Sequence, residues 1–441
     1  MSRQAFGIRP VLETLAYKQR QKPATPARPG APNKVKQMNA MDDPVAVFLP
    51  DNLERVVTPL LAQIAAQAEQ ADATRSIDPE VIAALKASDV MKLAATSNID
   101  GVGASVLQIG RELEAIAANC TSSAWTIWNH LAVFHLFVGC LGPDQHELIR
   151  GIVNRGEWVC FGAGAGSAIT GVIEGDTVRL NGSGAFSSGS RYADWGGAAF
   201  VVVDDDGKRV EPLDIRFTVV PLAREGVEID PTWDGSGVRA SATDDIGYTN
   251  VSVPLDRCVP WYGANRAAAL REVPVVDGRY REDWVGLSDI WLGWMGVGLV
   301  RAALHEATAE IRERKSIMGK KMVTRPTVQV NLGRAAALVA AAAATMETAC
   351  RQVDERVESQ QVPDEADYLR QMALATSGIN QLDEAMQLLM RCQGGNGLRE
   401  SRSFQRRWRD FQAMPLHINI HQDRVHHQLG RFVLGEDLEA F

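Results

Sequence analysis

The chain has 441 residues, 46% of them hydrophobic and 23% charged, and its formal net charge is −8 at pH 7. This balance excludes a chain that is disordered throughout and leaves ample material for a hydrophobic core. An acidic protein is a poor binder of nucleic acid, whose phosphates require a basic face. The longest apolar runs are interrupted by glycine and fall short of the roughly 20 residues of a membrane-spanning helix. We therefore expect neither nucleic acid nor a membrane as a partner.

The first 44 residues differ in composition from the rest of the chain. Residues 1–41 carry eight basic side chains against one acidic side chain, together with five prolines. Such a segment buries little surface, and residues 1–44 are expected to form a disordered basic extension. A targeting segment, or a start of translation at Met38 or Met41, would explain the same composition.

The six cysteines are scattered, without a CxxC pair or a dense cluster. This usage is typical of free thiols in a reducing compartment, and no signal-peptide core is visible near the N-terminus. We expect a cytoplasmic protein without a disulfide framework or a zinc site.

The spacing of apolar residues predicts helices, then strands, then helices. Residues 45–156 have a helical period, and residues 273–441 contain long, alanine-rich helical stretches. The predicted helices are Glu80–Ser88, Val106–Ala118, Ser122–Leu141, 143–156, Trp284–Arg314, one from Pro326, Glu365–Arg391 and Arg402–Val425, the last bent or broken near Pro415.

Short β-branched runs separated by turns mark the middle of the chain. Because strands and helices do not alternate, a doubly wound α/β fold is excluded. The sequence predicts a mostly helical α+β fold with an N-terminal α domain (45–156), a central antiparallel β-barrel or sandwich (157–272) and a C-terminal four-helix bundle (273–441). The β-branched runs are 177–180, 200–203, 217–220 and 251–253.

Two segments of the strand region are candidates for contact with a flat ligand. Residues 158–167 form a glycine- and alanine-rich run that lets a ligand approach the backbone, although a flexible hairpin loop would explain it as well. Residues 180–195 end a strand with an aromatic ring that can stack and two hydroxyls that can bind a ligand edge. The candidate contacts are Phe161, Ser167, Phe186, Ser187 and Ser188.

Two further segments lie at helix ends. Residues 312–321 end a helix with several cations, which either cap the helix dipole or, through Arg314, bind a phosphate. Residues 391–398 end another helix with glycines that expose the backbone to a ligand. The candidate contacts in the second segment are Gln393, Gly394 and Gly395.

These segments stand in the order of the motifs of the acyl-CoA dehydrogenase superfamily, which the chain resembles from about Phe48 to about Leu434. Residues 312–322 resemble its E-R-x-x-F-G-K-P-I segment, and residues 393–397 resemble its Q-x-x-G-G-x-G segment. The resemblance implies a homotetramer with flavin between subunits. It places Arg314 where the family contacts the flavin diphosphate of a neighbouring subunit.

Other patterns resemble the flavin-dependent monooxygenases of this superfamily, such as the hydroxyphenylacetate and dibenzothiophene monooxygenases. The stretch after Asp410 lacks the carboxylate base of a dehydrogenase, and His417 falls next to its place. The oxygenases share W-R-D followed by a histidine seven residues later, F-x-S-G-S-x-x-A-D-W as in 186–195, and A-W followed by a histidine, as in Trp125 and His135.

The oxygenase branch implies an oxidoreductase that works as one of two components. A separate NAD(P)H-dependent flavin reductase would supply reduced flavin, FAD or FMN, and O2 would react at C4a to give a (hydro)peroxide. One oxygen atom would pass to a small aromatic or amine-bearing substrate, in a pocket that excludes water. An acyl-CoA dehydrogenase or oxidase with a displaced base is the alternative, and a non-catalytic flavoprotein or scaffold is a third reading.

The resemblance makes His135 and His417 the candidate catalytic residues. A histidine near the flavin can hydrogen-bond the peroxide or deprotonate a phenol or an amine near neutral pH. His417 and His421 at spacing i, i+4 would also suit a metal on one helix face. No carboxylate stands between them as in a zincin, and we expect no metal site.

Several other residues have a structural reading beside a functional one. Trp125, Trp291 and Trp294 are candidates for an aromatic substrate pocket, with core packing as the alternative for the last two. Arg409 and Asp410 are adjacent, and we expect them to form a structural pair within their helix.

Overall fold

The computed structural model describes residues 55–164, 167–261 and 273–439. The predicted basic extension, residues 1–44, lies outside the described residues. The described residues, from residue 55 onward, belong to one compact unit. The boundaries expected at residues 156 and 272 lie inside this unit and stay a prediction.

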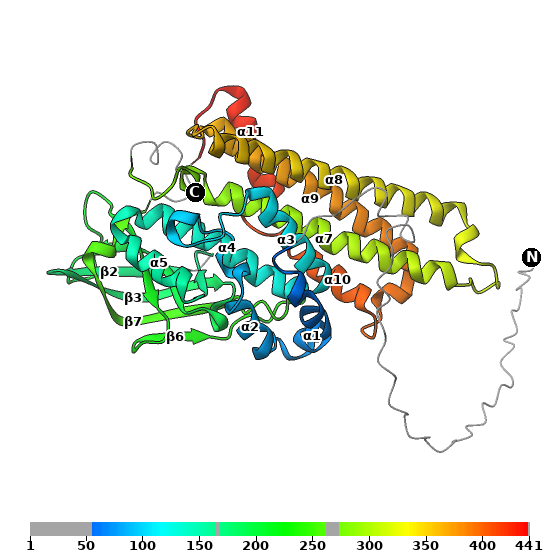
Figure 1. The fold of residues 1–441 in the computed structure, drawn as a ribbon, viewed down its shortest axis with the longest axis horizontal. Coiled ribbons are helices and arrows are strands. Elements are labelled where there is room, and N and C mark those ends of the chain that lie inside the picture. Colours follow the sequence, from blue (N-terminus) through cyan, green and yellow to red (C-terminus); the bar gives the residue numbers. More distant parts are fainter. Residues whose placement is uncertain (1–54, 165–166, 262–272, 440–441) are drawn as a thin grey trace, which may run out of the picture. The chain divides into compact units, whose positions relative to one another are not determined.

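Residues 55–156 form helices, as their periodicity predicts. Asp78 begins the second helix because its carboxylate accepts the N–H of Glu80 at 2.8 Å and Pro79 takes the first helical position. The N-terminus of the third helix is capped by a residue distant in sequence, since Asp354 accepts the N–H of Val106 at 2.7 Å. The helices are α1 (Leu61–Thr74), α2 (Pro79–Lys86), α3 (Val106–Asn119), α4 (Thr121–Leu141) and α5 (His146–Asn154) (Figure 1).

The middle of the chain forms one mixed eight-stranded sheet. Its strands lie in the order β6-β7-β3-β2-β4-β5-β8, and β1 pairs with β4. β4 runs parallel to both β1 and β2, while the other pairings are antiparallel. The strands are β1 (Val159–Phe161), β2 (Ala168–Glu174), β3 (Thr177–Ser187), β4 (Trp195–Val203), β5 (Ile215–Pro221), β6 (Val227–Asp230), β7 (Asp244–Pro254) and β8 (Val259–Pro260).

The expectation of an antiparallel barrel or sandwich is therefore wrong. β2 and β3 form a hairpin, but a 3-10 turn at Ser190–Tyr192 follows β3, and the next strand, β4, pairs with the other side of β2. β4 consequently runs parallel to β2. The path ends at β6 and β8, which do not pair with each other among the described strands, so the sheet stays open.

The C-terminal part is a helical bundle in which two short helices take the place of the fourth long one. Three long helices pack against one another, and the break expected near Pro415 separates the last two helices by turns. His417 lies in these turns and His421 caps the following helix, so the two histidines do not share a helix face. The helices are α7 (Trp284–Glu313), α8 (Pro326–Glu358), α9 (Glu365–Gln393), α10 (Ser403–Gln412) and α11 (Gln422–Leu434).

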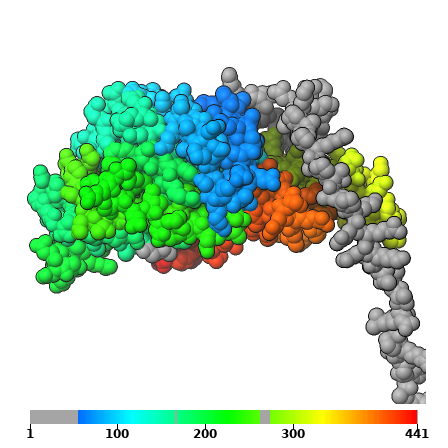
Figure 2. Space-filling model, turned by 90° about the horizontal axis from the view of Figure 1, so that it is seen from below, coloured from blue at the N-terminus to red at the C-terminus, as the bar shows by residue number. Residues whose placement is uncertain are grey.

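Figure 2 shows the sheet in green beside the blue N-terminal helices, with the orange C-terminal segment next to them. Within this arrangement α4 is central, since it contacts α3, α7 and β1 and buries almost all of its side chains. Side chains of α4 therefore reach both the sheet and the C-terminal helices.

By length and composition, three of the described helices could cross a membrane, namely α4, α7 and α8. This finding corrects the expectation that the apolar runs are too short. The apolar windows of α4 and α7 are 89% buried inside the protein, whereas that of α8 is 28% buried. Burial in the hydrophobic core explains why α4 and α7 are so apolar. α8, in contrast, leaves an alanine-rich face exposed.

Candidate functional site

His417 lies against two tryptophans of α4. Its ring packs edge-on to Trp128, with 5.1 Å between ring centroids, and to Trp125, with 5.9 Å. The two indoles contact each other at 5.1 Å, and Trp128 is fixed by donating to the carbonyl oxygen of Ser288 on α7 at 2.8 Å. The turn after α10 thus presents an imidazole against an aromatic wall.

The surroundings of His417 determine its protonation. Burial, and then the nearby Arg424 guanidinium, lower the pKa of His417 to about 4, so the ring is neutral at pH 7. The N–H of Asn419 points at Nδ1 at 3.4 Å, which leaves the proton of the neutral ring on Nε2. His417 is therefore better suited to donate a hydrogen bond from Nε2 than to act as a strong base.

Arg424 holds the turn that carries His417. From α11 it donates to the carbonyl oxygens of Ile418 at 3.3 Å and Asn419 at 3.0 Å. Beneath it, Asp289 on α7 is fully buried, and neither carboxyl oxygen has a hydrogen-bond partner among the described residues. Burial raises the pKa of Asp289 well above its ordinary value, and the nearby Arg424 guanidinium opposes this shift.

A chain of hydroxyl groups leads from the other side of the aromatic wall into the sheet. Trp125 donates from Nε1 to Ser188 Oγ at 3.0 Å. Ser188 Oγ lies 2.9 Å from Thr243 Oγ1, which lies 2.7 Å from Ser241 Oγ. Through Trp125, the end of β3 is linked to His417, although the two are distant in sequence.

Ser187 and Phe186 stand next to this chain in a bulge of β3 against β7. Ser187 is fully buried, and its Oγ has no hydrogen-bond partner among the described residues. A Cβ at Gly162 would lie 2.1 Å from that Oγ, so only glycine leaves this space free. The unpaired hydroxyl is what a polar ligand atom would satisfy.

Phe186 has a backbone conformation that aromatic residues rarely adopt. Its φ is 60°, which costs about 1–2 kcal/mol for a residue with a Cβ. The strain turns the ring outward, so that it is 52% exposed and lies edge-on to Trp233 at 6.5 Å. An exposed ring held this way offers a stacking surface to a flat ligand.

Arg314 and Gln393 meet at a second location. Arg314, at the end of α7, donates to the backbone oxygens of Gln393, at 3.0 Å, and of Cys392, and to Gln393 Oε1 at 3.3 Å. The adjoining Gly394 and Gly395 are exposed, and a Cβ on either would meet nothing within 4 Å. The result is an open backbone surface next to a guanidinium.

The two locations are far apart within one chain. Ser288, which binds Trp128, and Arg314 lie at opposite ends of α7, roughly 39 Å apart at 1.5 Å per residue. The structure thus brings Phe186, Ser187, Ser188, Trp125 and His417 together and leaves Arg314 and Gln393 elsewhere.

The remaining predicted residues each contact other parts of the chain, with Phe161 and His135 buried and Ser167 exposed. Phe161 is buried among aromatic rings, 5.6 Å from Phe217, and Ser167 Oγ accepts the N–H of Ala185 at 2.8 Å. His135 Nε2 lies 2.9 Å from the backbone oxygen of Glu282, about 15 Å along α4 from Trp125.

Trp291 and Trp294 are fully buried, which accords with the core-packing alternative. Trp291 donates to the backbone oxygen of Val106 at 3.1 Å, and Trp294 donates to Cys350 Sγ at 3.2 Å. The Arg111 guanidinium covers the Trp294 ring at 4.2 Å.

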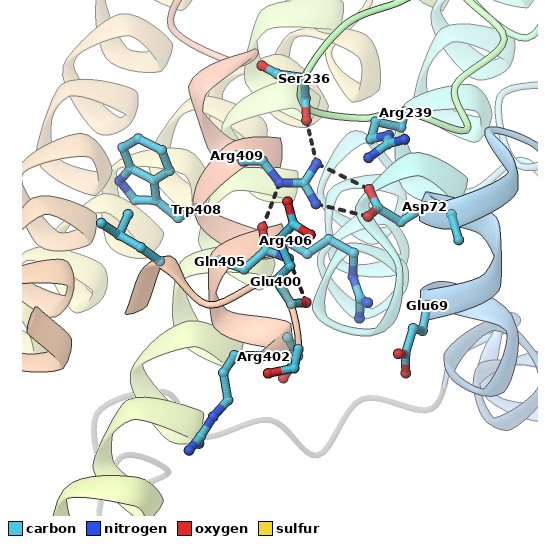
Figure 3. A pocket seen from close by; sticks show the side chains of 14 residues that line it. Glu69, Asp72, Ser236, Arg239, Glu400, Arg402, Gln405, Arg406, Trp408 and Arg409 are labelled. Carbon is cyan, nitrogen blue, oxygen red and sulfur yellow. Dashed lines mark hydrogen bonds and ion pairs between the residues drawn. The ribbon is translucent and has the colours of Figure 1, made fainter. Parts of the chain in front are cut away.

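A pocket of about 650 Å³ lies where α1, α10 and the loop before β7 meet (Figure 3). Arg409 pairs with Asp72 at 2.9 Å and donates to Gln405 at 2.7 Å. The expected pair between Arg409 and Asp410 is therefore wrong, because the two side chains leave α10 in different directions. Asp410 accepts the N–H of Val238 at 2.7 Å.

The sequence patterns did not identify Trp128, Thr243, Asp289 or Arg424. Trp128 follows Trp125 by three residues and could have been found as its neighbour on one helix face. Thr243 meets Ser188 only through strand pairing, which local patterns do not reveal. Among the described residues, no group of three or more His, Cys, Asp or Glu side chains could hold a metal ion.

The chain is similar to several known proteins. Residues 290–422 match the family described as "Acyl-CoA dehydrogenase, C-terminal domain". A pigment production hydroxylase of Rhodococcus sp. is 28% identical over 58% of this chain and 64% of its own length. The oxygenase component of an FADH2-dependent resorcinol hydroxylase of Rhizobium sp. is 24% identical over 83% of this chain and 90% of its own length. The chain spans just under two thirds of the two pigment production hydroxylases, at 64% and 66%.

Solved structures show the same fold. XiaF from Streptomyces sp., in complex with FADH2 and glycerol, superposes with a TM-score of 0.79 at 19% identity, over 90% of this chain and 97% of that one. Dibenzothiophene monooxygenase from Paenibacillus sp. gives 0.74 at 19% identity, over 87% and 97%. The resemblance to the acyl-CoA dehydrogenase superfamily and to its flavin-dependent monooxygenases is confirmed.

Proposed function

We propose that the protein is the oxygenase component of a two-component flavin-dependent monooxygenase, acting on a small aromatic or amine-bearing molecule. The observation that carries this proposal is the contact of His417 with Trp125, which links it to Ser188 at the exposed Phe186. Relatives named as oxygenase components support it over the alternative.

Residues of the chain fit a flavin at this place. Phe186 offers an exposed ring, and Ser187 offers a buried hydroxyl that has no partner among the described residues. Reduced flavin, when bound, would activate O2 for transfer of one oxygen atom. Either FAD or FMN would satisfy these contacts, since both carry the same isoalloxazine ring.

The chain's own residues would position the reactants and exclude water. Trp125 and Trp128 provide an apolar wall, and the buried Ser188 and Thr243 hydroxyls can hold a hydrogen bond in fixed geometry. His417, neutral and protonated on Nε2, would donate to an anionic oxygen in the site. No step needs a carboxylate base.

A second subunit would complete the cofactor site. Arg314 lies roughly 39 Å along α7 from the aromatic wall, too far to join one compact site there within one chain. We propose a homotetramer in which Arg314, Gln393 and the glycines after it bind the flavin phosphates of a neighbouring subunit. The exposed, small side chains of α8 support close packing between copies.

The further partners follow from the proposed chemistry. A separate NAD(P)H-dependent flavin reductase would supply reduced flavin, and naming of the relatives as oxygenase components supports this. We propose a cytoplasmic location on the six free cysteines, five of them buried.

The alternative is an acyl-CoA dehydrogenase or oxidase, and anaerobic titration separates the two readings. The proposal predicts that the protein binds reduced FMN or FAD more tightly than the oxidised flavin, and that an acyl-CoA does not bleach bound oxidised flavin. Tight binding of oxidised flavin with bleaching by an acyl-CoA would support the dehydrogenase. Absence of flavin binding at micromolar concentrations would leave a non-catalytic scaffold.

A further inference from the structure

The loop between β6 and β7 is strained. Val238 has a φ of 42° and Ala242 a φ of 47°. A positive φ at a β-branched residue is rare, and such conformations persist only where the surroundings hold them. The contacts of residues 236–243 therefore determine whether this loop keeps its shape.

Two consecutive residues of α10 hold the first half of the loop. Arg409 donates to the backbone oxygen of Ser236, as Figure 3 shows, and Asp410 accepts the N–H of Val238 at 2.7 Å. A Cβ at Gly237 would lie 2.2 Å from the Arg409 oxygen, so the loop backbone rests directly on α10. On its other side, Trp233 donates to the backbone oxygen of Val238 at 3.1 Å.

The second half of the loop carries the hydroxyl chain of the candidate site. Ser241 and Thr243 lie 2.7 Å apart, and Thr243 reaches Ser188 at 2.9 Å. Because Ser188 also accepts from Trp125, a shift of the loop changes the polar side of the proposed site.

We propose that Asp410 is a positioning residue that, by holding the N–H of Val238, keeps residues 236–243 strained and Thr243 against Ser188. The effect on catalysis rests on the proposed function, whereas the effect on the loop does not. Asp410 is 4% exposed, so its hydrogen bond is shielded from water.

The charge of Asp410 makes the contact sensitive to pH. Burial and the neighbouring Asp72 of α1 raise its pKa, the N–H of Val238 and the Arg409 and Arg406 guanidiniums lower it, and the outcome is about 6. Two further titratable groups interact with Asp410, namely Cys120 at the start of α4, whose pKa burial raises, and Arg407 of α10, whose pKa burial lowers. Below pH 6 Asp410 loses the charge that strengthens its bond to Val238.

Hydrogen exchange measured by mass spectrometry on the full chain tests the contact without any cofactor. The protection factors of residues 236–243 should fall about fivefold as the pH drops from 7.5 to 5. Asp410→Asn, a neutral acceptor, should hold the lower value at both pH values, and Asp410→Ala should reduce it further. Protection in Asp410→Ala equal to that of the unchanged protein would overturn the proposal. A decrease in the protection of Asp410→Asn when the pH is lowered would overturn it as well.

Asp354→Ala is the matched control, because Asp354 is a half-buried carboxylate that also accepts backbone N–H groups, those of Val106 and Leu107. It should lower the melting temperature and leave exchange in 236–243 unchanged. If Asp354→Ala changed that exchange as much as Asp410→Ala does, the effect would reflect global destabilisation. Asp410 would then have no specific positioning role.

A second arm measures product formed per reduced flavin oxidised. In the unchanged protein this yield should decrease as the pH is lowered from 7.5 to 5. In Asp410→Asn it should stay at the low-pH level at both pH values, and Thr243→Val should also decrease it. Absence of product from the unchanged protein at every pH would count against the proposed function. A normal yield in Asp410→Ala would count against the link between the loop and the site.

Discussion

His417 is neutral at physiological pH, and this limits its chemistry. With a pKa near 4 it is a weak base, so it would act by donating from Nε2. The sequence indicated that this histidine belongs to the candidate active site. The structure adds its tautomer, because the N–H of Asn419 donates to Nδ1. The two tryptophans around it fix its orientation.

His417→Ala should lower the yield of oxygenated product at least about tenfold and release the missing oxidising equivalents as hydrogen peroxide. The side chain lies in a turn, so the melting temperature should change little. The measurement is product and peroxide per reduced flavin, with His426→Ala, an exposed position on α11, as control. An unchanged ratio in His417→Ala would remove it from the mechanism.

Arg314→Ala should weaken binding of reduced flavin about tenfold to a hundredfold, because a guanidinium bond to phosphate is charge-assisted. Anaerobic fluorescence titration measures it. Arg312→Ala, an exposed cation two residues earlier, is the control. Equal dissociation constants for Arg314→Ala and the unchanged protein would show that Arg314 only caps α9, where it binds Gln393 and Cys392.

Among the elements, the segment that leads into α7 depends on one buried ion pair. Glu282 accepts two bonds from Arg356 of α8, both at 2.9 Å, and one from Gln371 of α9 at 2.9 Å. Its backbone oxygen also lies 2.9 Å from His135 Nε2 on α4. One residue therefore joins the N-terminal helices to the bundle.

Glu282→Ala should lower the free energy of unfolding by about 3 kcal/mol, since it leaves the buried Arg356 guanidinium with Asp367, at 3.3 Å, as its remaining carboxylate partner. Urea denaturation checks this. Glu174→Ala removes the exposed pair with Arg179 and should cost less than about 1 kcal/mol. Similar decreases in the free energy of unfolding of the two variants would show that burial does not make the Glu282 ion pair more important than an exposed one.

The helices were predictable because apolar period and capping residues are local signals. α3 and α4 begin and end within a residue or two of the expected positions, and Pro415 does separate α10 from α11. The sheet topology was not predictable, because the pairing of β4 with β2 depends on contacts between segments that are distant in sequence. For the same reason Ser188 was a candidate while its partner Thr243 was not.

At the scale of the whole molecule, the length of α7 separates the two groups of candidate flavin contacts. Assembly would bring the Arg314 end of one chain to the Phe186 end of another. α8 offers a face for such packing, because Val330 is 67% exposed and small residues follow it at helical spacing. These exposed residues are Gly333, Ala337, Ala341 and Ala344.

Ala337→Glu combined with Ala341→Glu should break the proposed tetramer into smaller species, because carboxylates would then face each other across close-packed helices. Light scattering coupled to size exclusion measures the mass. Gln63→Glu, at an exposed position on α1, adds a charge elsewhere and should leave the assembly intact. An unchanged mass in the double variant would exclude this face from the interface.

In the proposed function, one atom of O2 passes to a small organic substrate. The direct measurement mixes the purified protein, loaded anaerobically with reduced FMN or FAD, with 18O-labelled O2 and a panel of phenols, indoles and amines. We expect a product that contains one 18O atom, formed in proportion to the reduced flavin that is oxidised. Reduction of bound oxidised flavin by an acyl-CoA, together with the absence of 18O from every organic product, would show that this chemistry does not occur.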